Sequence, residues 1–154
     1  MAPNRIYLHA VKPEDLEYIF EIEKRSFRVP WSLNMFRDEI SNPLSRSIVA
    51  KRWNSGAEIL GYLFYQVVSF EMHILNLAVH PSFRSRGIGT ALLKEGFMVE
   101  REKGTARYAF LEVRENNKTA IRLYRKLGFK QLGLRKNYYS KEKVNAIVMG
   151  RPID

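Results

Sequence analysis

The chain has 154 residues, of which 45% are hydrophobic and 27% charged, and this is the balance of one folded domain. No apolar run approaches the roughly 20 residues needed to cross a bilayer, and the first residues do not resemble a secretory signal. We therefore expect a cytoplasmic protein without a membrane span. The absence of cysteine excludes disulfides, thiolate metal sites and a cysteine nucleophile. Because the three histidines are scattered, no metal site is expected.

The net charge of +10 admits three kinds of partner: nucleic acid, an acidic substrate or a phosphorylated cofactor. Basic residues are spread between Arg101 and Lys143 without a long uninterrupted block or a recognisable nucleic-acid motif. This distribution favours solvated faces that steer an anion over a dedicated nucleic-acid groove.

The first half of the chain predicts a strand, two helices and a long hairpin. The strand covers 5–10, the first helix starts at Pro13, the second helix runs from the N-cap Ser32 to about Pro43, and the hairpin strands 47–53 and 59–69 flank the turn Asn54-Ser55-Gly56. On the second helix we expect Met35, Phe36 and Ile40 to face inward.

The second half alternates strands and helices. The expected elements are strands over 74–79 and 108–113, helices over 89–103 and 117–127 that end at Gly104 and Gly128, and final strands over 129–134 and 144–149 around a polar segment, 135–143. The order predicts an α/β domain whose central sheet is mixed, mostly antiparallel and flanked by helices, with a parallel pair around the first of these helices.

The most informative stretch is the apolar strand Ile74–Val79, which runs into the basic turn Arg84-Ser85-Arg86-Gly87-Ile88-Gly89-Thr90. Its glycines let the backbone approach a ligand, the helix start offers unpaired N–H groups, and the arginines add charge. The turn predicts a site for an anionic cofactor, although the glycine spacing alone fits a plain surface turn equally well. Neither the dinucleotide-binding fingerprint nor the Walker motif is complete.

This turn resembles the Arg/Gln-x-x-Gly-x-Gly/Ala signature of the GCN5-related N-acetyltransferase (GNAT) family. A second and more specific motif carries the same resemblance: Leu-Glu-Val-Arg at 111–114, Asn117, Ala-Ile-x-Leu-Tyr at 120–124 and Leu-Gly-Phe at 127–129. In order and spacing this motif is similar to the N-terminal protein acetyltransferases of that family, namely the bacterial ribosomal-protein alanine type and the archaeal enzymes. The similarity covers nearly the whole chain and implies a single GNAT domain over 1–154.

The residues leave two interpretations open for each catalytic candidate. Glu112 interrupts an apolar strand, so it lies either in solvent or in a cleft where it could take a proton. Tyr124 follows Asn117 by seven residues, which places both on one helical face where one ligand could touch them, but Tyr124 could equally be a core aromatic. The resemblance implies that Glu112 is the general base and Tyr124 the general acid.

The resemblance also implies acetyl-coenzyme A as the cofactor. Backbone groups of the strand and turn would hold it, together with two side chains of the following motif. The implied cofactor-binding residues are Leu77, Ala78, Val79, Ser85, Arg86, Gly87, Ile88, Gly89, Thr90, Asn117 and Tyr124. The side chains of Leu77, Ala78 and Val79 are expected to belong to the core.

Three aromatic residues are implied to contact the substrate: Trp31, Tyr138 and Tyr139. A packing role for Trp31 and Tyr139 is an equal alternative. His73 matches a histidine that archaeal relatives carry and is an auxiliary candidate for substrate deprotonation, with a surface residue as the plainer alternative.

These features predict an acetyl-CoA-dependent enzyme that acetylates the N-terminal α-amino group of a protein, with a ribosomal protein as a candidate, by direct attack in a ternary complex. Three alternatives remain at this level: acetylation of a small amine such as a polyamine or antibiotic, a non-catalytic acyl-CoA sensor, and a basic nucleic-acid partner.

Overall fold

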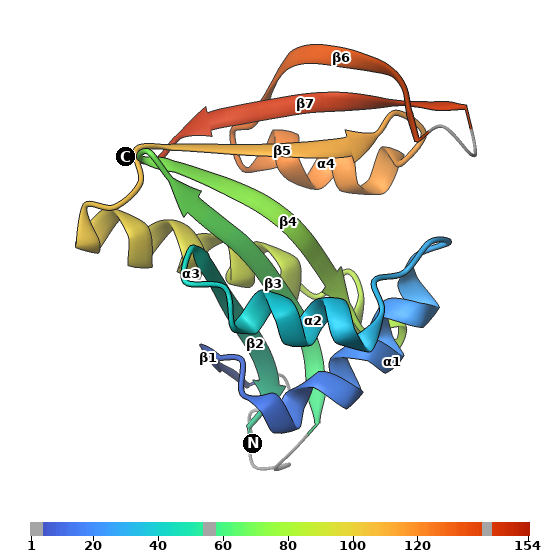
Figure 1. Cartoon of the computed structure of the whole chain (residues 1–154), viewed down its shortest axis with the longest axis vertical. Helices are drawn as coiled ribbons and strands as arrows, with labels where there is room; N and C mark the ends of the chain where they lie inside the picture. The colour runs from blue at the N-terminus through green and yellow to red at the C-terminus, as the bar shows by residue number, and fades with distance from the viewer. Residues whose placement is uncertain (1–4, 54–57, 140–142) are drawn as a thin grey trace.

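The computed structural model describes residues 5–53, 58–139 and 143–154 (Figure 1). The predicted turn at 54–56 lies outside these residues. The elements are β1 Ile6–Ala10, η1 Pro13–Asp15, α1 Leu16–Ser26, α2 Leu33–Ile40, β2 Ser45–Arg52, β3 Ile59–Val68, β4 Glu71–Val79, η2 Pro81–Phe83, α3 Ile88–Lys103, β5 Tyr108–Arg114, α4 Lys118–Lys126, β6 Lys130–Tyr139 and β7 Val144–Pro152.

The strands form one sheet in the order β1-β2-β3-β4-β5-β7-β6. Every neighbouring pair is antiparallel except β4 and β5. These two parallel strands are in register only at Glu71 with Tyr108, Met72 with Ala109 and His73 with Phe110. Beyond this point they separate (Figure 1), and the sheet divides into two wings, one formed by β1 to β4 and the other by β5, β7 and β6. The predicted mixed, mostly antiparallel sheet is confirmed.

Helices cover both faces of the sheet and divide the core in two. Helices α1 and α2 pack on one face, where Phe36, Tyr62 and Phe64 form an aromatic cluster. Helix α3 packs on the other face, and the buried apolar residues of α4 join the same core. At Gly96 a Cβ atom would come within 2.9 Å of Met72, so glycine allows α3 to lie close to the sheet.

Cap residues set the helix ends, as predicted at Ser32 and Gly104 and without a prediction at Asn117. The Ser32 hydroxyl accepts a hydrogen bond from the Met35 N–H at 3.1 Å, and Gly104 ends α3 in the left-handed conformation with φ +66°. Asn117 is the N-cap of α4, and its side chain accepts from Ala120 N–H at 3.1 Å.

Two predictions about local structure are wrong. Met35 is 47% exposed rather than inward, because at the first turn of α2 its sulfur lies back toward the Ser32 N–H. The segment 135–139 is not a connecting loop: β6 continues to Tyr139, and a register shift between Arg135 and Tyr139 accommodates its polar residues at the sheet edge. None of the helices in the described residues is long and apolar enough to cross a membrane.

Candidate active site

The separation of β4 from β5 leaves one edge of β4 open. Leu77, Ala78 and Val79 pair with β3 on their other side, and no described strand pairs with their free edge. Their side chains pack into or against the core, as predicted. A register shift at Leu75 bulges β4 near the point of separation. Backbone amides of this stretch are therefore available to a chain-like ligand that carries amide groups.

The basic turn leads from the end of β4 into α3. Gly87 is the N-cap with φ +81° and provides no side-chain cap. The first hydrogen bond of the helix joins Ala91 N–H to the Gly87 carbonyl, so the N–H groups of 88–90 have no acceptor within the helix. Together with the positive end of the helix dipole, they form a site that suits a phosphate.

The two arginines of this turn have different surroundings. Arg84 donates from Nε to the Val79 carbonyl at 3.2 Å and from Nη2 to the Ser26 hydroxyl at 3.3 Å. It therefore ties the turn to β4 and α1. Arg86 is exposed, and its guanidinium lies 5.3 Å from the centroid of the Phe83 ring. Arg86 thus offers its charge to a ligand at the surface.

Glu112 lies on β5, on the face opposite to the buried residues Leu111 and Val113. Its side chain is 28% exposed and its Oε1 atom is 3.2 Å from Nη1 of Arg135. Tyr138 donates a hydrogen bond to the same carboxylate, and this bond, more than the carboxylate charge, raises the pKa of Tyr138 above its usual 10.0. Glu112 is thus a partly exposed carboxylate in a polar cluster, with an oxygen that a bound ligand could reach by a hydrogen bond.

Asn117 precedes α4 as its N-cap, and Tyr124 lies seven residues later, near the C-terminal end of the same helix. The Tyr124 ring is buried, with 8% of the residue exposed, and packs edge-on against Phe129 at 5.7 Å. The packing interpretation is therefore correct for the ring. Asn117 uses its Oδ1 atom to cap α4, and this cap leaves its amide nitrogen to other partners.

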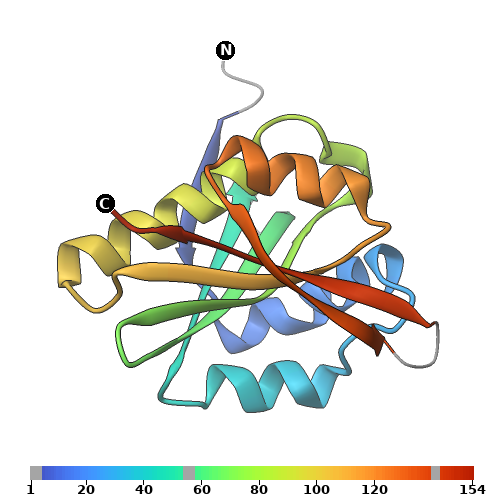
Figure 2. The same cartoon turned by 90° about the horizontal axis from the view of Figure 1, so that it is seen from above.

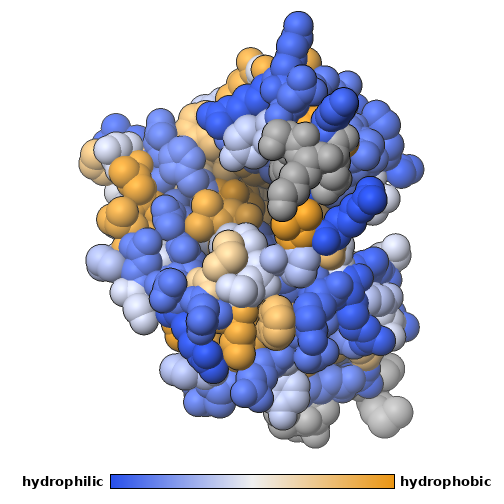
Figure 3. All heavy atoms as spheres, turned by 45° about the vertical axis from the view of Figure 1, so that its right-hand side comes forward, coloured by the Kyte–Doolittle hydropathy of each residue, from blue (hydrophilic) through white to orange (hydrophobic). Residues whose placement is uncertain are grey.

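The α1–α2 turn lies on the same side of the molecule as the end of β6 and the start of β7 (Figures 1 and 2). Figure 3 brings this side forward and shows apolar atoms in a hollow between the two wings. Trp31 packs against Phe36 at 5.1 Å and Phe64 at 6.0 Å, so it has a packing role. Tyr138 is 48% exposed, and Tyr139 ends β6 in register with Val144.

His73 lies where β4 and β5 still pair. Its ring stacks on Phe110 with centroids 5.6 Å apart, and its Nε2 atom is 3.0 Å from Glu71. Phe110 precedes Glu112 by two residues on the same face of β5. His73 therefore lies beside the strand that carries Glu112, but its ring contacts Phe110 and Glu71.

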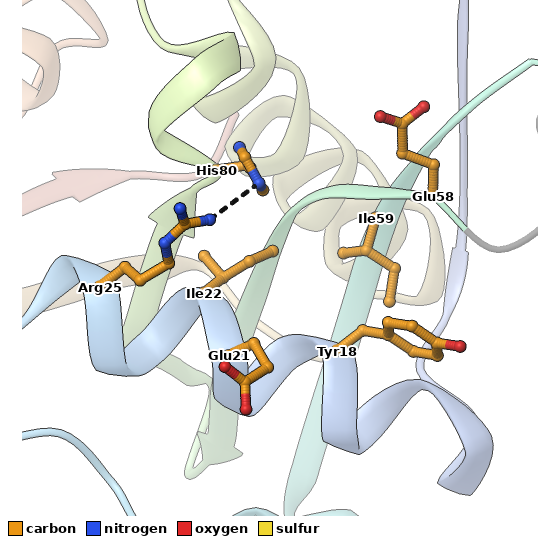
Figure 4. Close-up of a pocket in the computed structure, with 7 residues that line it drawn as sticks. All are labelled: Tyr18, Glu21, Ile22, Arg25, Glu58, Ile59 and His80. Atoms are coloured by element: carbon orange, nitrogen blue, oxygen red, sulfur yellow. Dashed lines mark hydrogen bonds between the residues drawn. The ribbon is translucent and has the colours of Figure 1, made fainter.

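A separate cavity of about 360 Å³ lies between α1 and the start of β3 (Figure 4). Tyr18, Glu21, Arg25, Glu58 and His80 are among the residues that line it. Burial, and secondarily the Arg25 charge, lowers the pKa of His80. The lining of this cavity contains both acidic and basic side chains and none of the predicted site residues, so it is not the candidate site for acetyl transfer.

Sequence reasoning missed Arg135 as a partner of Glu112. The sequence places Arg135 in a run of basic residues 23 positions after Glu112, and no periodicity or motif links them. Among the described residues, no cluster of three or more His, Asp or Glu side chains could hold a metal ion.

These features fit one elongated ligand. Free N–H groups at the α3 terminus suit a pyrophosphate, the open β4 edge suits amides, and Glu112 lies on the strand across the opening. Coenzyme A combines a pyrophosphate with an amide-bearing arm that ends in a thiol. The residues present therefore fit acetyl-coenzyme A without any further group.

Comparison with known proteins gives the same result. The sequence model of the acetyltransferase (GNAT) family matches residues 16–129, and the chain belongs to this family. The chain is 34% identical over 148 residues to the [ribosomal protein bS18]-alanine N-acetyltransferase of Escherichia coli strain K12, covering 95% of this chain and 97% of that protein. Acetyl-CoA is the acetyl donor of the family, and this chain is an acetyltransferase.

Solved structures agree with the sequence comparison. The ribosomal-protein-S18-alanine N-acetyltransferase from Escherichia coli superposes with a TM-score of 0.87 at 30% identity, covering 97% of this chain and 95% of that one. Ard1 from Thermoplasma volcanium superposes with a TM-score of 0.84 at 28% identity, covering 96% and 97%. The expected resemblance to the bacterial ribosomal-protein alanine type is confirmed.

Proposed function

We propose that this protein transfers the acetyl group of acetyl-CoA to the N-terminal α-amino group of a protein, with a ribosomal protein of the bS18 type as substrate. The observation that carries the proposal is the partly exposed carboxylate of Glu112 on the strand across from the open edge of β4. The relatives named as alanine N-acetyltransferases match nearly the whole chain, and they support a protein N-terminus as the acceptor. A ribosomal substrate implies work in the cytoplasm.

Acetyl-CoA, when bound, supplies an acetyl thioester. The N–H groups of 88–90 and the exposed Arg86 would hold its pyrophosphate, and the free edge at Leu77–Val79 would hold its amides and the thioester carbonyl. Asn117, at the start of α4, would bind the pantetheine arm through its amide nitrogen.

Glu112 would take a proton from the incoming α-ammonium, directly or through water. An α-amino group has a pKa near 8, against about 10.4 for lysine, so a carboxylate can deprotonate it more readily. The Tyr124 hydroxyl would return a proton to the leaving thiolate. Since the chain has no cysteine, the amine attacks the thioester directly and no acyl-cysteine forms.

The acceptor would enter between the α1–α2 turn and the ends of β6 and β7. Tyr138 is exposed near the end of β6 and is hydrogen-bonded to Glu112, so it would contact the first residue of a peptide. Trp31 would shape the opposite wall through its packing on Phe36 and Phe64. Tyr139 remains a substrate-binding candidate by its place at the end of β6.

Thiol release from acetyl-CoA tests the proposal. The acceptors would be short peptides that vary at the first two residues, each with a free or blocked N-terminus, and a set of polyamines. We expect turnover with free N-termini, highest with that of a bS18-type sequence. Equal turnover on blocked peptides that contain lysine would contradict the α-amine assignment, and preference for polyamines would support a small-amine enzyme instead.

A further inference from the structure

A second carboxylate, that of Glu23, lies under the turn that joins α1 to α2. Only 1% of this residue is exposed. Its Oε1 atom accepts hydrogen bonds from the Tyr62 hydroxyl at 2.6 Å and the Asn76 amide at 2.8 Å. Its Oε2 atom accepts from the Trp31 N–H at 2.9 Å. One buried acid thus holds three donors from three different parts of the chain.

One of these donors, Trp31, belongs to the proposed site, and a second, Asn76, borders it. Trp31 closes the α1–α2 turn on the acceptor side, and Asn76 lies on β4 between the bulge at Leu75 and the free edge that begins at Leu77. Tyr62 lies on β3, next to Ala78 of β4 in the sheet register. The network therefore connects the wall of the acceptor opening to the strand that faces the acetyl group.

The network carries a cost that simple packing would avoid. Asn76 is 6% exposed, and its Oδ1 atom is buried without a hydrogen-bond partner in the described structure. The reverse orientation of the amide would place this oxygen against the Glu23 carboxylate, so the orientation is dictated by Glu23. Apolar residues of similar volume often stabilise a core as well as a buried charge does, which argues for a role besides stability.

We propose that Glu23 is a positioning residue for the acceptor substrate: it holds the α1–α2 turn at Trp31 and the neighbouring stretch of β4 in the geometry that receives the peptide. This inference rests on the proposed function. Loss of one donor should loosen the acceptor side while leaving the cofactor turn at the start of α3 in place. The expected signature is a raised peptide KM with an unchanged KM for acetyl-CoA.

The chain offers a matched control on the other side of the sheet. Glu100 of α3 is also fully buried, and the Tyr65 hydroxyl donates to its Oε2 atom at 2.6 Å. Thr105 is a second donor to Glu100, from the loop that follows α3. Unlike Glu23, Glu100 also has a cation nearby, with Arg46 Nε 3.9 Å from its Oε2 atom. This network shares the buried tyrosine–carboxylate bond of the first but touches neither Trp31 nor Asn76.

The experiment compares Tyr62→Phe with Tyr65→Phe in the full chain. Each variant removes one hydroxyl from a buried carboxylate, so we expect a similar fall in Tm of about 2 to 8 °C. Only Tyr62→Phe should raise the peptide KM, by about five- to tenfold, the effect of one lost hydrogen bond. Glu23→Gln, which keeps the shape and one acceptor oxygen, should change the peptide KM less than Glu23→Ala.

Equal peptide KM values for Tyr62→Phe and Tyr65→Phe, with both Tm values lowered, would show a merely structural role for Glu23 and overturn the inference. If Tyr62→Phe does not fold, the peptide KM of Glu23→Gln is compared with that of the wild type. A raised peptide KM supports the inference, and an unchanged one overturns it. A wild-type protein that acetylates no α-amine peptide would contradict the proposed function instead, so the two failures are distinguishable.

Discussion

Glu112 on β5 and Arg135 on β6 form an ion pair that spans the intervening strand β7, with 3.2 Å between Oε1 and Nη1. The pair is possible because Val148 and Ala146, small to medium residues of β7, lie between them in the sheet register. Its energy in isolation is small, since Arg135 is 56% exposed. Its main effect is to orient the carboxylate that we propose as the base.

Replacing Glu112 by Gln should lower turnover by about 100-fold or more, because the amide cannot accept the substrate proton. Binding of acetyl-CoA should survive, since the α3 terminus is untouched. Thiol-release kinetics and calorimetric titration with acetyl-CoA measure the two effects. Turnover that stays at the wild-type value would remove Glu112 from the mechanism.

Tyr124→Phe should lower kcat by about 10- to 100-fold while the ring keeps its contact with Phe129. Tyr124→Ala is the comparison, because it loses both the hydroxyl and the packing and should also lower Tm. Steady-state kinetics and thermal unfolding separate these outcomes. A Phe variant with the wild-type kcat would leave Tyr124 as a core residue only.

The pKa of Tyr138 should respond in opposite directions to changes in its two charged neighbours. The neutral hydroxyl donates to the Glu112 carboxylate, which also repels a phenolate, so Glu112→Gln should lower the Tyr138 pKa toward 10.0. The Arg135 charge lowers this pKa, so Arg135→Gln should raise it further. Titration by NMR of labelled tyrosine measures both, and shifts in the same direction would argue against the cluster.

Gly87 and Gly104 lie at opposite ends of α3 and form a matched pair. Both have positive φ, +81° and +66°, and at both a Cβ atom would have no neighbour within 4 Å. Alanine at either position should therefore cost about 1 kcal/mol of unfolding free energy through backbone strain alone. Only Gly87→Ala should raise the KM for acetyl-CoA, by about tenfold, because only Gly87 belongs to the phosphate turn. Urea unfolding and kinetics test both statements, and equal KM values would move the pyrophosphate elsewhere.

Stability should fall in alkali above about pH 10. Burial, with the adjacent carboxylates Glu23 and Glu100 as further causes, raises the pKa of Tyr62 and of Tyr65 far above 10.0. Above this pH the folded state keeps tyrosine protons that the unfolded state releases. The contribution of these tyrosines to the free energy of unfolding is therefore fully present below pH 10 and decreases as the pH rises further. Urea unfolding on both sides of pH 10 measures this slope, which should be smaller in Tyr62→Phe. An unchanged slope would mean that Tyr62 ionises in the folded protein.

The sequence by itself determined the elements and the motifs that local chemistry controls. The cap at Ser32, the glycine stop at Gly104 and the turn before α3 depend on neighbours a few residues away, so spacing reveals them. The predictions that Met35 faces inward and that the last-but-one strand ends at 134 were wrong, because side-chain exposure and strand pairing depend on the elements that pack alongside.

Only the tertiary structure decided how the site is assembled. Strands β4 and β5 separate after His73, Arg135 reaches Glu112 across β7, and Glu23 joins Trp31 to Asn76. These contacts join residues that are far apart along the chain, and their side chains could serve equally well as solvated surface charges. Their partners are chosen by the fold, because only the packed sheet and helices bring those atoms within hydrogen-bonding distance.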